Sequence, residues 1–168
     1  KPTRRQFIAT AVLAAPFVKS LAKTAPEFHG SVIGHGDRRY RVDKLWSKAD
    51  SAKTPVKDCH EMVQVPDGRL FLLTNHKQNN VLIYDVKGTL LDQWTLGMSG
   101  AHGLTFHDGH LYLCDTTGRV VKATLDGQIV LELPHAVKEG IYKPSEAYAP
   151  TESAVAPNGD IYVADGYG

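Results

Sequence analysis

Hydrophobic and polar residues alternate along most of the chain after residue 60, in short runs separated by turn residues. The segments "HEMVQVPDGRLFLLT" (60–74), "HGLTFHDGHLYLCD" (102–115) and "TESAVAPNGDIYVAD" (151–165) each hold two such runs, joined at an Asp-Gly or Asn-Gly pair. Alternation with a period of two predicts half-buried strands, and these pairs supply the positive φ that tight turns require. The pattern therefore predicts three β-hairpins.

The first two hairpins continue into a second pair of strands. Residues 80–97 turn at Lys87-Gly88, and residues 118–134 turn at Asp126-Gly127. A unit of four antiparallel strands that recurs after roughly 40 to 50 residues is typical of a β-propeller blade, and the alternation excludes helical repeats of similar length. We therefore predict an all-β fold, a β-propeller with two complete blades over 60–134 and half of a third.

A closed propeller has roughly four to eight blades, so we expect residues 60–168 to be the N-terminal blades of a longer protein. Residues 26–59 are interpreted as a linker with one strand, "YRVDKLW" (40–46), that completes the last blade and locks the ring. The connection "HAVKEGIYKPSEAYAP" (135–150) is longer than the others. It is either a functional loop or an extended crossover between blades, and the sequence leaves both interpretations open.

The first 25 residues have the order of an export signal. Arg4 and Arg5 precede an apolar run that ends near Val18, and Lys19 follows the run. This resembles a twin-arginine signal peptide, and the run is too short to span a bilayer comfortably. We therefore expect export by the twin-arginine machinery, to the periplasm or to another location outside the cytoplasm, with no stable membrane span after cleavage of residues 1–25.

Composition adds two limits. The formal charge of +1, without a cluster of basic residues beyond the first few positions, argues against a nucleic-acid partner. The chain has two cysteines, Cys59 and Cys114, both in or beside strand-like stretches. An oxidising compartment permits a disulfide between them, but two buried thiols fit the pattern at least as well, so we do not predict a disulfide.

The third hairpin carries a more specific resemblance. Residues 150–155, "PTESAV", lead into a second strand that ends in Asp165-Gly166-Tyr167. Together with "AHGLTFHDGHLYLCD" (101–115), this resembles the NHL-repeat six-bladed propellers, and among them the peptidyl-α-hydroxyglycine α-amidating lyase domain and its bacterial relatives. The resemblance covers about residues 58–168.

This resemblance implies a zinc ion on the propeller axis, held by histidines at the starts of alternate blades. The family's zinc-ligand position corresponds to His102, and its catalytic tyrosine corresponds to Tyr167. In that family the pair cleaves a peptidyl-α-hydroxyglycine into a peptide amide and glyoxylate. Single histidines from separated blades can meet at the axis and leave a coordination position open for substrate, and a nearby cation favours the anionic form of a phenol. The sequence gives no indication about calcium.

The chain departs from the family pattern in the first blade. The lyase carries a substrate-binding arginine after the second strand, where this chain has Asn75 or His76; neither offers a guanidinium group, and Lys77 does not replace its geometry. His60, at the start of the first blade, either joins the axial cluster or caps its strand. Two functions therefore stay open: an exported, metal-dependent carbon-nitrogen lyase acting on a peptide or small molecule, or a non-catalytic propeller that binds a protein, peptide or glycan. Either is expected to be monomeric when complete.

Overall fold

The computed structural model describes residues 27–168, and every regular element in this range is a β-strand. The predicted signal peptide lies outside the described residues. The described residues divide into two compact units, residues 27–42 and residues 43–168, which are described separately. None of the described residues forms a helix long and apolar enough to cross a membrane.

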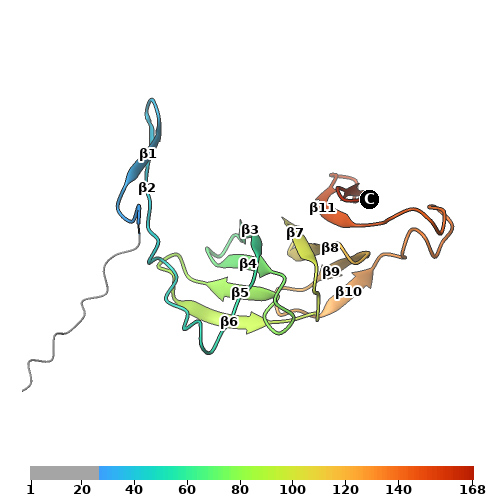
Figure 1. The fold of residues 1–168 in the computed structure, drawn as a ribbon, viewed down its shortest axis with the longest axis horizontal. Helices are drawn as coiled ribbons and strands as arrows, with labels where there is room; N and C mark the ends of the chain where they lie inside the picture. The colour runs from blue at the N-terminus through green and yellow to red at the C-terminus, as the bar shows by residue number, and fades with distance from the viewer. Residues whose placement is uncertain (1–26) are drawn as a thin grey trace, which may run out of the picture. The chain divides into compact units, whose positions relative to one another are not determined.

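The second unit contains three antiparallel sheets in chain order (Figure 1). The first sheet has the order β3-β4-β5-β6, with strands Cys59–Gln64, Leu70–Thr74, Val81–Tyr84 and Leu90–Trp94. The second has the order β7-β8-β9-β10, with strands Ala101–His107, His110–Asp115, Arg119–Ala123 and Ile129–Glu132. The third pairs β11, Pro150–Val155, with β12, Ile161–Asp165. The predicted two four-stranded blades and one half-blade are confirmed.

The turns form where the sequence predicts them. Gly68, Gly88 and Gly127 have φ values between 80° and 91°, a region that residues with a Cβ adopt rarely. Asp108 adopts a φ of 43° before Gly109, as a hairpin turn with two left-handed residues requires.

Apolar side chains from the first two sheets form one core between them. Phe71 and Leu73 of β4 pack with Leu104 of β7 and with Leu111 and Leu113 of β8, and each is at most 1% exposed. β5 is buried along its whole length because it lies in the middle of its sheet with both faces covered. Burial of this apolar area is the main source of stability in the two complete blades.

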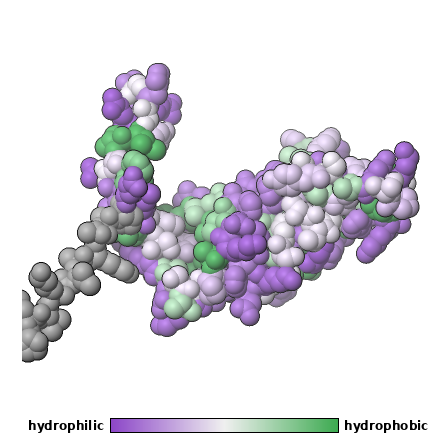
Figure 2. Space-filling model, in the orientation of Figure 1, coloured by the Kyte–Doolittle hydropathy of each residue, from purple (hydrophilic) through white to green (hydrophobic). Residues whose placement is uncertain are grey.

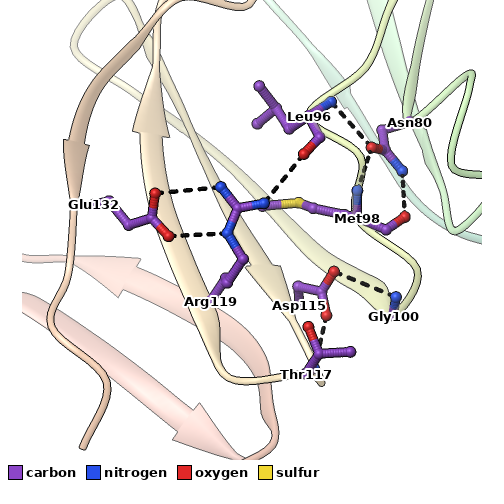
Figure 3. Close-up of polar contacts among 8 residues, drawn as sticks. All are labelled: Asn80, Leu96, Met98, Gly100, Asp115, Thr117, Arg119 and Glu132. Carbon is purple, nitrogen blue, oxygen red and sulfur yellow. Dashed lines mark hydrogen bonds and ion pairs between the residues drawn. The ribbon is translucent and has the colours of Figure 1, made fainter. Parts of the chain in front are cut away.

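The crossover between these blades, residues 95–100, is held by polar side chains, of which Asn80 is buried and Arg119 is partly exposed (Figure 3). Asn80 is fully buried; its amide oxygen accepts hydrogen bonds from the backbone N–H of Leu96 and Met98, and its amide nitrogen donates to the Met98 carbonyl. Arg119 forms a two-bond ion pair with Glu132 and donates a third hydrogen bond to the Leu96 carbonyl. These bonds fix the segment that leads into β7.

In the second and third sheets, the last residue of the second strand also holds the residue that precedes the inner strand of the same sheet. Asp115 accepts a hydrogen bond from the Gly100 N–H at 3.3 Å, and a second from the Thr117 N–H at 2.7 Å (Figure 3). In the third sheet, Asp165 accepts from the Ala149 N–H at 2.8 Å. The starts of the inner strands are therefore clamped to the ends of their neighbours.

The first unit holds a hairpin of β1, Val32–His35, and β2, Arg38–Arg41. The strand predicted over 40–46 is thus shorter and begins earlier: it ends at Arg41, and residues 42–46 lie outside any strand. The physical reason is the "GHGD" turn, where positive φ at Gly34 and Gly36 lets the chain fold back on itself. The proposed ring-closing role stays a prediction. Figure 2 shows apolar surface on this hairpin, where Val32, Ile33 and Tyr40 are exposed.

The long connection before the third sheet contains no strand between residues 133 and 149. Three aromatic side chains order it: His135 contacts Tyr148 with ring centroids 5.2 Å apart, and Tyr148 contacts Tyr142 at 5.6 Å. Both contacts are edge-on, which is a favoured geometry for aromatic pairs.

Candidate functional site

The inner strands of the three sheets share a β-bulge at their second residue. The pairing register shifts between Cys59 and Glu61 in β3, between Ala101 and Gly103 in β7, and between Pro150 and Glu152 in β11. A bulged residue is left out of the ladder, and such bulges often redirect a side chain beside an active site. The three skipped residues are His60, His102 and Thr151.

The bulges bring the side chains of successive blades together. The rings of His60 and His102 stack with centroids 4.4 Å apart and planes 24° from parallel. Nδ1 of His102 lies 3.0 Å from the carbonyl oxygen of Thr151. His60 therefore lies at the same cluster as His102, which is one of the two alternatives that the sequence leaves open.

The hydrogen bonds of His102 determine its tautomer. A carbonyl oxygen can only accept, so Nδ1 carries the hydrogen and donates to Thr151, and Nε2 of the neutral ring is left with a free lone pair. Nε2 lies 3.3 Å from the hydroxyl of Tyr167, and the two rings meet edge-on with centroids 5.5 Å apart. The structure thus brings together His102 and Tyr167, the two site residues expected from the sequence.

Two glycines make this close approach possible. A Cβ on Gly103 would lie 2.5 Å from the Thr151 carbonyl oxygen and 2.7 Å from the Cα of Glu152. A Cβ on Gly166, next to Tyr167, would lie 2.5 Å from the Thr151 hydroxyl oxygen. Any larger residue at either position would push β11 away from His102 or displace Tyr167.

The chemistry of His102 fits a metal ligand. Metal-binding histidines commonly donate their second ring N–H to a backbone carbonyl, which orients the ring and directs the other nitrogen to the metal, and His102 makes this bond to Thr151. Within residues 27–168, however, no three His, Cys, Asp or Glu side chains are grouped so that they could hold a metal ion. His102 would therefore supply one ligand, and a zinc site would need others.

A pair of carboxyl groups lies behind the histidines and was not expected from the sequence. Glu61 of β3 accepts a hydrogen bond from the Leu104 N–H of β7 at 2.9 Å. Glu152 of β11 accepts from the hydroxyl of Thr105 at 3.0 Å. Burial, together with a hydrogen bond to Glu152, raises the pKa of Glu61 to about 7. The signal in the sequence is a Glu after both His60 and Thr151, while the equivalent position of the middle blade is Gly103.

The two cysteines are free thiols, one at each extreme of exposure. Cys114 is fully buried in β8, and burial raises its pKa to about 12. Cys59 is exposed at the first residue of β3, so the alternative of two buried thiols is wrong for Cys59.

Asn75 and His76 occupy the position where the lyases that the sequence resembles carry a substrate-binding arginine, and both have other contacts here. The Asn75 amide nitrogen donates to the Asp58 carboxylate at 2.9 Å, and its oxygen accepts from the Asp58 N–H at 3.1 Å, so this side chain clamps the start of β3. The backbone N–H of His76 donates to the Thr74 hydroxyl, and the His76 ring lines a cavity at the same end of the blade.

Solved structures of similar fold share little sequence with this chain. The structure of streptogramin B lyase matches with a TM-score of 0.51 at 15% identity, over 66% of this chain and 35% of that one. The extracellular domain of the putative hybrid two-component system BT3049 from B. thetaiotaomicron matches with a TM-score of 0.53 at 12% identity, over 77% of this chain and 16% of that one.

The sheet topology and these matches agree. The chain has a β-propeller fold. At such identities the likeness concerns the fold alone, and the chain spans only about a third of the streptogramin B lyase chain. No family model matches the chain, and no curated protein matches it.

Proposed function

We propose that this propeller belongs to an exported, zinc-dependent lyase of the peptidyl-α-hydroxyglycine type. The observation that carries the proposal is the contact between His102 Nε2 and the Tyr167 hydroxyl, with His102 Nδ1 held by the Thr151 carbonyl. The likeness to streptogramin B lyase concerns the fold alone. It adds that one protein of similar fold is a lyase.

In this proposal the residues divide the work. A bound zinc ion would polarise the substrate and favour the anionic form of a nearby phenol. Tyr167, whose side chain is 66% exposed, would take the proton of the substrate hydroxyl. The carbon-nitrogen bond then breaks as the carbon-oxygen bond becomes a carbonyl, and the amide nitrogen gains a proton, so a peptide amide and glyoxylate are released. His60, stacked on His102, keeps that ring in place.

The decisive experiment combines metal analysis with a glyoxylate assay on the full-length protein, purified without chelators. His102→Ala should lower zinc content strongly, because it removes a direct donor. Tyr167→Phe should keep the zinc and slow turnover by roughly 100-fold or more, because it removes only the titratable hydroxyl. His110→Ala is the matched control, since among residues 27–168 the His110 ring hydrogen-bonds only within its own turn, to the Asp108 carbonyl.

Two outcomes would end the proposal: a wild-type protein without stoichiometric metal, or full glyoxylate release by Tyr167→Phe. The non-catalytic binding propeller would then take its place. Export is tested separately by fusing residues 1–30 to a reporter and replacing Arg4 and Arg5 with lysine. The double-lysine fusion should remain in the cytoplasm, and unimpaired export would exclude the twin-arginine route.

A further inference from the structure

A cavity of about 500 Å³ opens beside the first blade and lies apart from the His102 cluster. Its lining residues are Lys57, Asn75, His76, Lys77, Gln78 and Ser99. They come from the segment before β3, the loop after β4 and the crossover before β7. All three segments belong to the end of the sheets at which the inner strands begin, so the cavity opens at the end that carries His102.

The repeat places this cavity more closely. Thr74 and Asp165 occupy equivalent positions, because each pairs with the first residue of its inner strand, Cys59 and Pro150. His76 therefore stands in the first blade where Tyr167 stands in the third, two residues after the second strand. A ligand in the cavity would meet a histidine at the position that carries the tyrosine of the candidate site.

The charge of the lining is positive. Lys57 and Lys77 contribute two cations, and none of the six lining residues is acidic. Lys57 forms an ion pair with the carboxylate of Asp58, at 3.8 Å. Both side chains are exposed to solvent, so this ion pair is weak. Asp58 is also engaged by Asn75. Lys77 has no ion pair with any of the described residues.

The loop that carries these side chains is already ordered. The amide of Asn80 donates to the His76 carbonyl at 3.3 Å, and the Thr95 hydroxyl donates to the Lys77 carbonyl at 2.5 Å. The amide of Asn79 donates to the Pro55 carbonyl at 2.6 Å. Because these hydrogen bonds already fix the backbone of the loop, a ligand would not need to order it, and less binding free energy is lost to conformational entropy.

The ring of His76 adds a donor. Its Nδ1 is buried without a hydrogen-bond partner among the described residues. A neutral imidazole has one donor and one acceptor nitrogen, and the arrangement that avoids a buried, unpaired N–H places the hydrogen on Nε2. The hydrogen-bond donors that line the cavity then include the His76 ring and the two charged lysines, Lys57 and Lys77.

We propose that this cavity is a binding subsite for an oxyanion, the carboxylate or phosphate group of a ligand, held by Lys57, His76 and Lys77. Lysine ammonium groups form charge-assisted hydrogen bonds with such oxygens, which are roughly twice as strong as neutral ones. The subsite is independent of the metal chemistry proposed above, and it would serve a lyase and a binding propeller alike.

The test measures binding to the full-length protein by calorimetry at low salt, with three probes: N-acetylglycine, inorganic phosphate, and the neutral N-acetylglycinamide. At least one of the two anions should bind, and the amide should not. The double variant Lys57→Gln/Lys77→Gln should weaken anion binding by about tenfold or more, because charged hydrogen bonds contribute more than neutral ones. Whichever anion binds identifies the source of the oxyanion.

The control is Lys87→Gln, which makes the same type of substitution once, in the turn between β5 and β6 at the opposite end of the sheet. This variant should bind the anion like the wild type. The proposal is overturned if neither anion binds, if the amide binds as well as N-acetylglycine, or if Lys87→Gln weakens binding as much as the double variant. Because no readout involves zinc or turnover, failure here is distinct from failure of the lyase proposal.

Discussion

The second strands of the second and third sheets have nearly the same sequence pattern and very different surroundings. β8 reads "HLYLCD" and β12 reads "IYVAD", and their register makes Tyr112 equivalent to Tyr162 and Leu113 equivalent to Val163. Tyr112 is 4% exposed and Tyr162 is 63% exposed. Leu113 is fully buried, whereas Val163 is half-buried.

The difference comes from neighbours, since the strands themselves are alike. β8 pairs on both sides, with β7 and β9, and it packs against the first sheet; among the described residues β12 pairs only with β11. An alternating pattern specifies a strand and its two faces, but a face becomes buried only when another layer covers it. The comparison predicts large effects of mutation in β8 and small ones in β12.

The largest effect is expected from removing a core side chain. Leu113→Ala should lower the free energy of unfolding by about 4 kcal/mol, because it leaves a cavity between two sheets that cannot collapse around it. The equivalent change in the third sheet, Val163→Ala, should cost less than about 1 kcal/mol. Urea denaturation of both variants measures this, and equal losses would show that the two strands are equally covered.

A smaller difference is expected for the two clamping carboxylates. Asp115→Ala leaves the N–H groups of Gly100 and Thr117 without their acceptor in a buried site, which should cost about 2 kcal/mol. Asp165→Ala removes one such bond, to the Ala149 N–H, and should cost about 1 kcal/mol. Thermal denaturation measures the stability of both variants. The Asp165 variant should also reduce turnover in the lyase assay, since Tyr167 lies two residues after the Asp165 contact. Unchanged turnover would show that Tyr167 is positioned without this contact.

The carboxyl groups at the inner edge predict a dependence of stability on pH. The pKa of Glu61 is raised from 4.5 to about 7, so the folded protein binds more protons than the unfolded chain between these values. Stability from this group is therefore fully present below pH 4.5 and is lost as the pH rises through about 7. Relative to Glu61→Gln, the wild type should lose stability across this window in denaturation at a series of pH values.

Glu132→Gln is the control for that titration. Its ion pair with Arg119 lowers the pKa of Glu132, so its contribution has the opposite sign and is lost as the pH falls. The Glu132 variant should keep the decline between pH 4.5 and about 7 that Glu61 produces. If Glu61→Gln retains the same decline as the wild type, Glu61 does not hold its proton in the folded state.

The smallest effect on stability is expected at Tyr162, within about 0.5 kcal/mol, because the side chain is exposed. Its effect on association should be larger. Residues 26–168 produced alone present β12 as an unpaired edge, which favours pairing between chains. Tyr162→Lys should reduce light scattering of this segment, because a charge on an edge strand opposes pairing. If the wild-type segment stays monomeric, the exposed edge of β12 does not cause association between chains.

Much of the fold follows from local sequence. The Asp-Gly and Asn-Gly pairs place the turns, and alternation of apolar residues identifies ten strands of the second unit between residues 59 and 165. The first unit was predicted less well, because its strand "RRYR" is exposed on both faces and does not alternate apolar with polar residues. Residues 42–46, which were expected to extend this strand, mix apolar residues with Asp43 and Lys44. Such a run is compatible with a strand, but it does not show where pairing with the neighbouring strand stops.

The candidate site was only partly accessible from sequence. The resemblance identified His102 and Tyr167, but nothing in the local pattern predicted the bulge that turns His60, His102 and Thr151 out of their ladders. The Glu61 and Glu152 pair was missed because the two residues are far apart in the chain and meet only across the strand that contains Gly103.

The sequence by itself determined the blades of this protein, since turn conformation and the two faces of a strand depend on neighbouring residues alone. Tertiary structure decided which strands became core, which carboxyl group holds a proton near neutral pH, and which histidine nitrogen is free to meet Tyr167. The physical reason is that burial, electrostatic coupling and hydrogen bonding between blades depend on distances across sheets, and those distances are set only when the inner strands pack side by side.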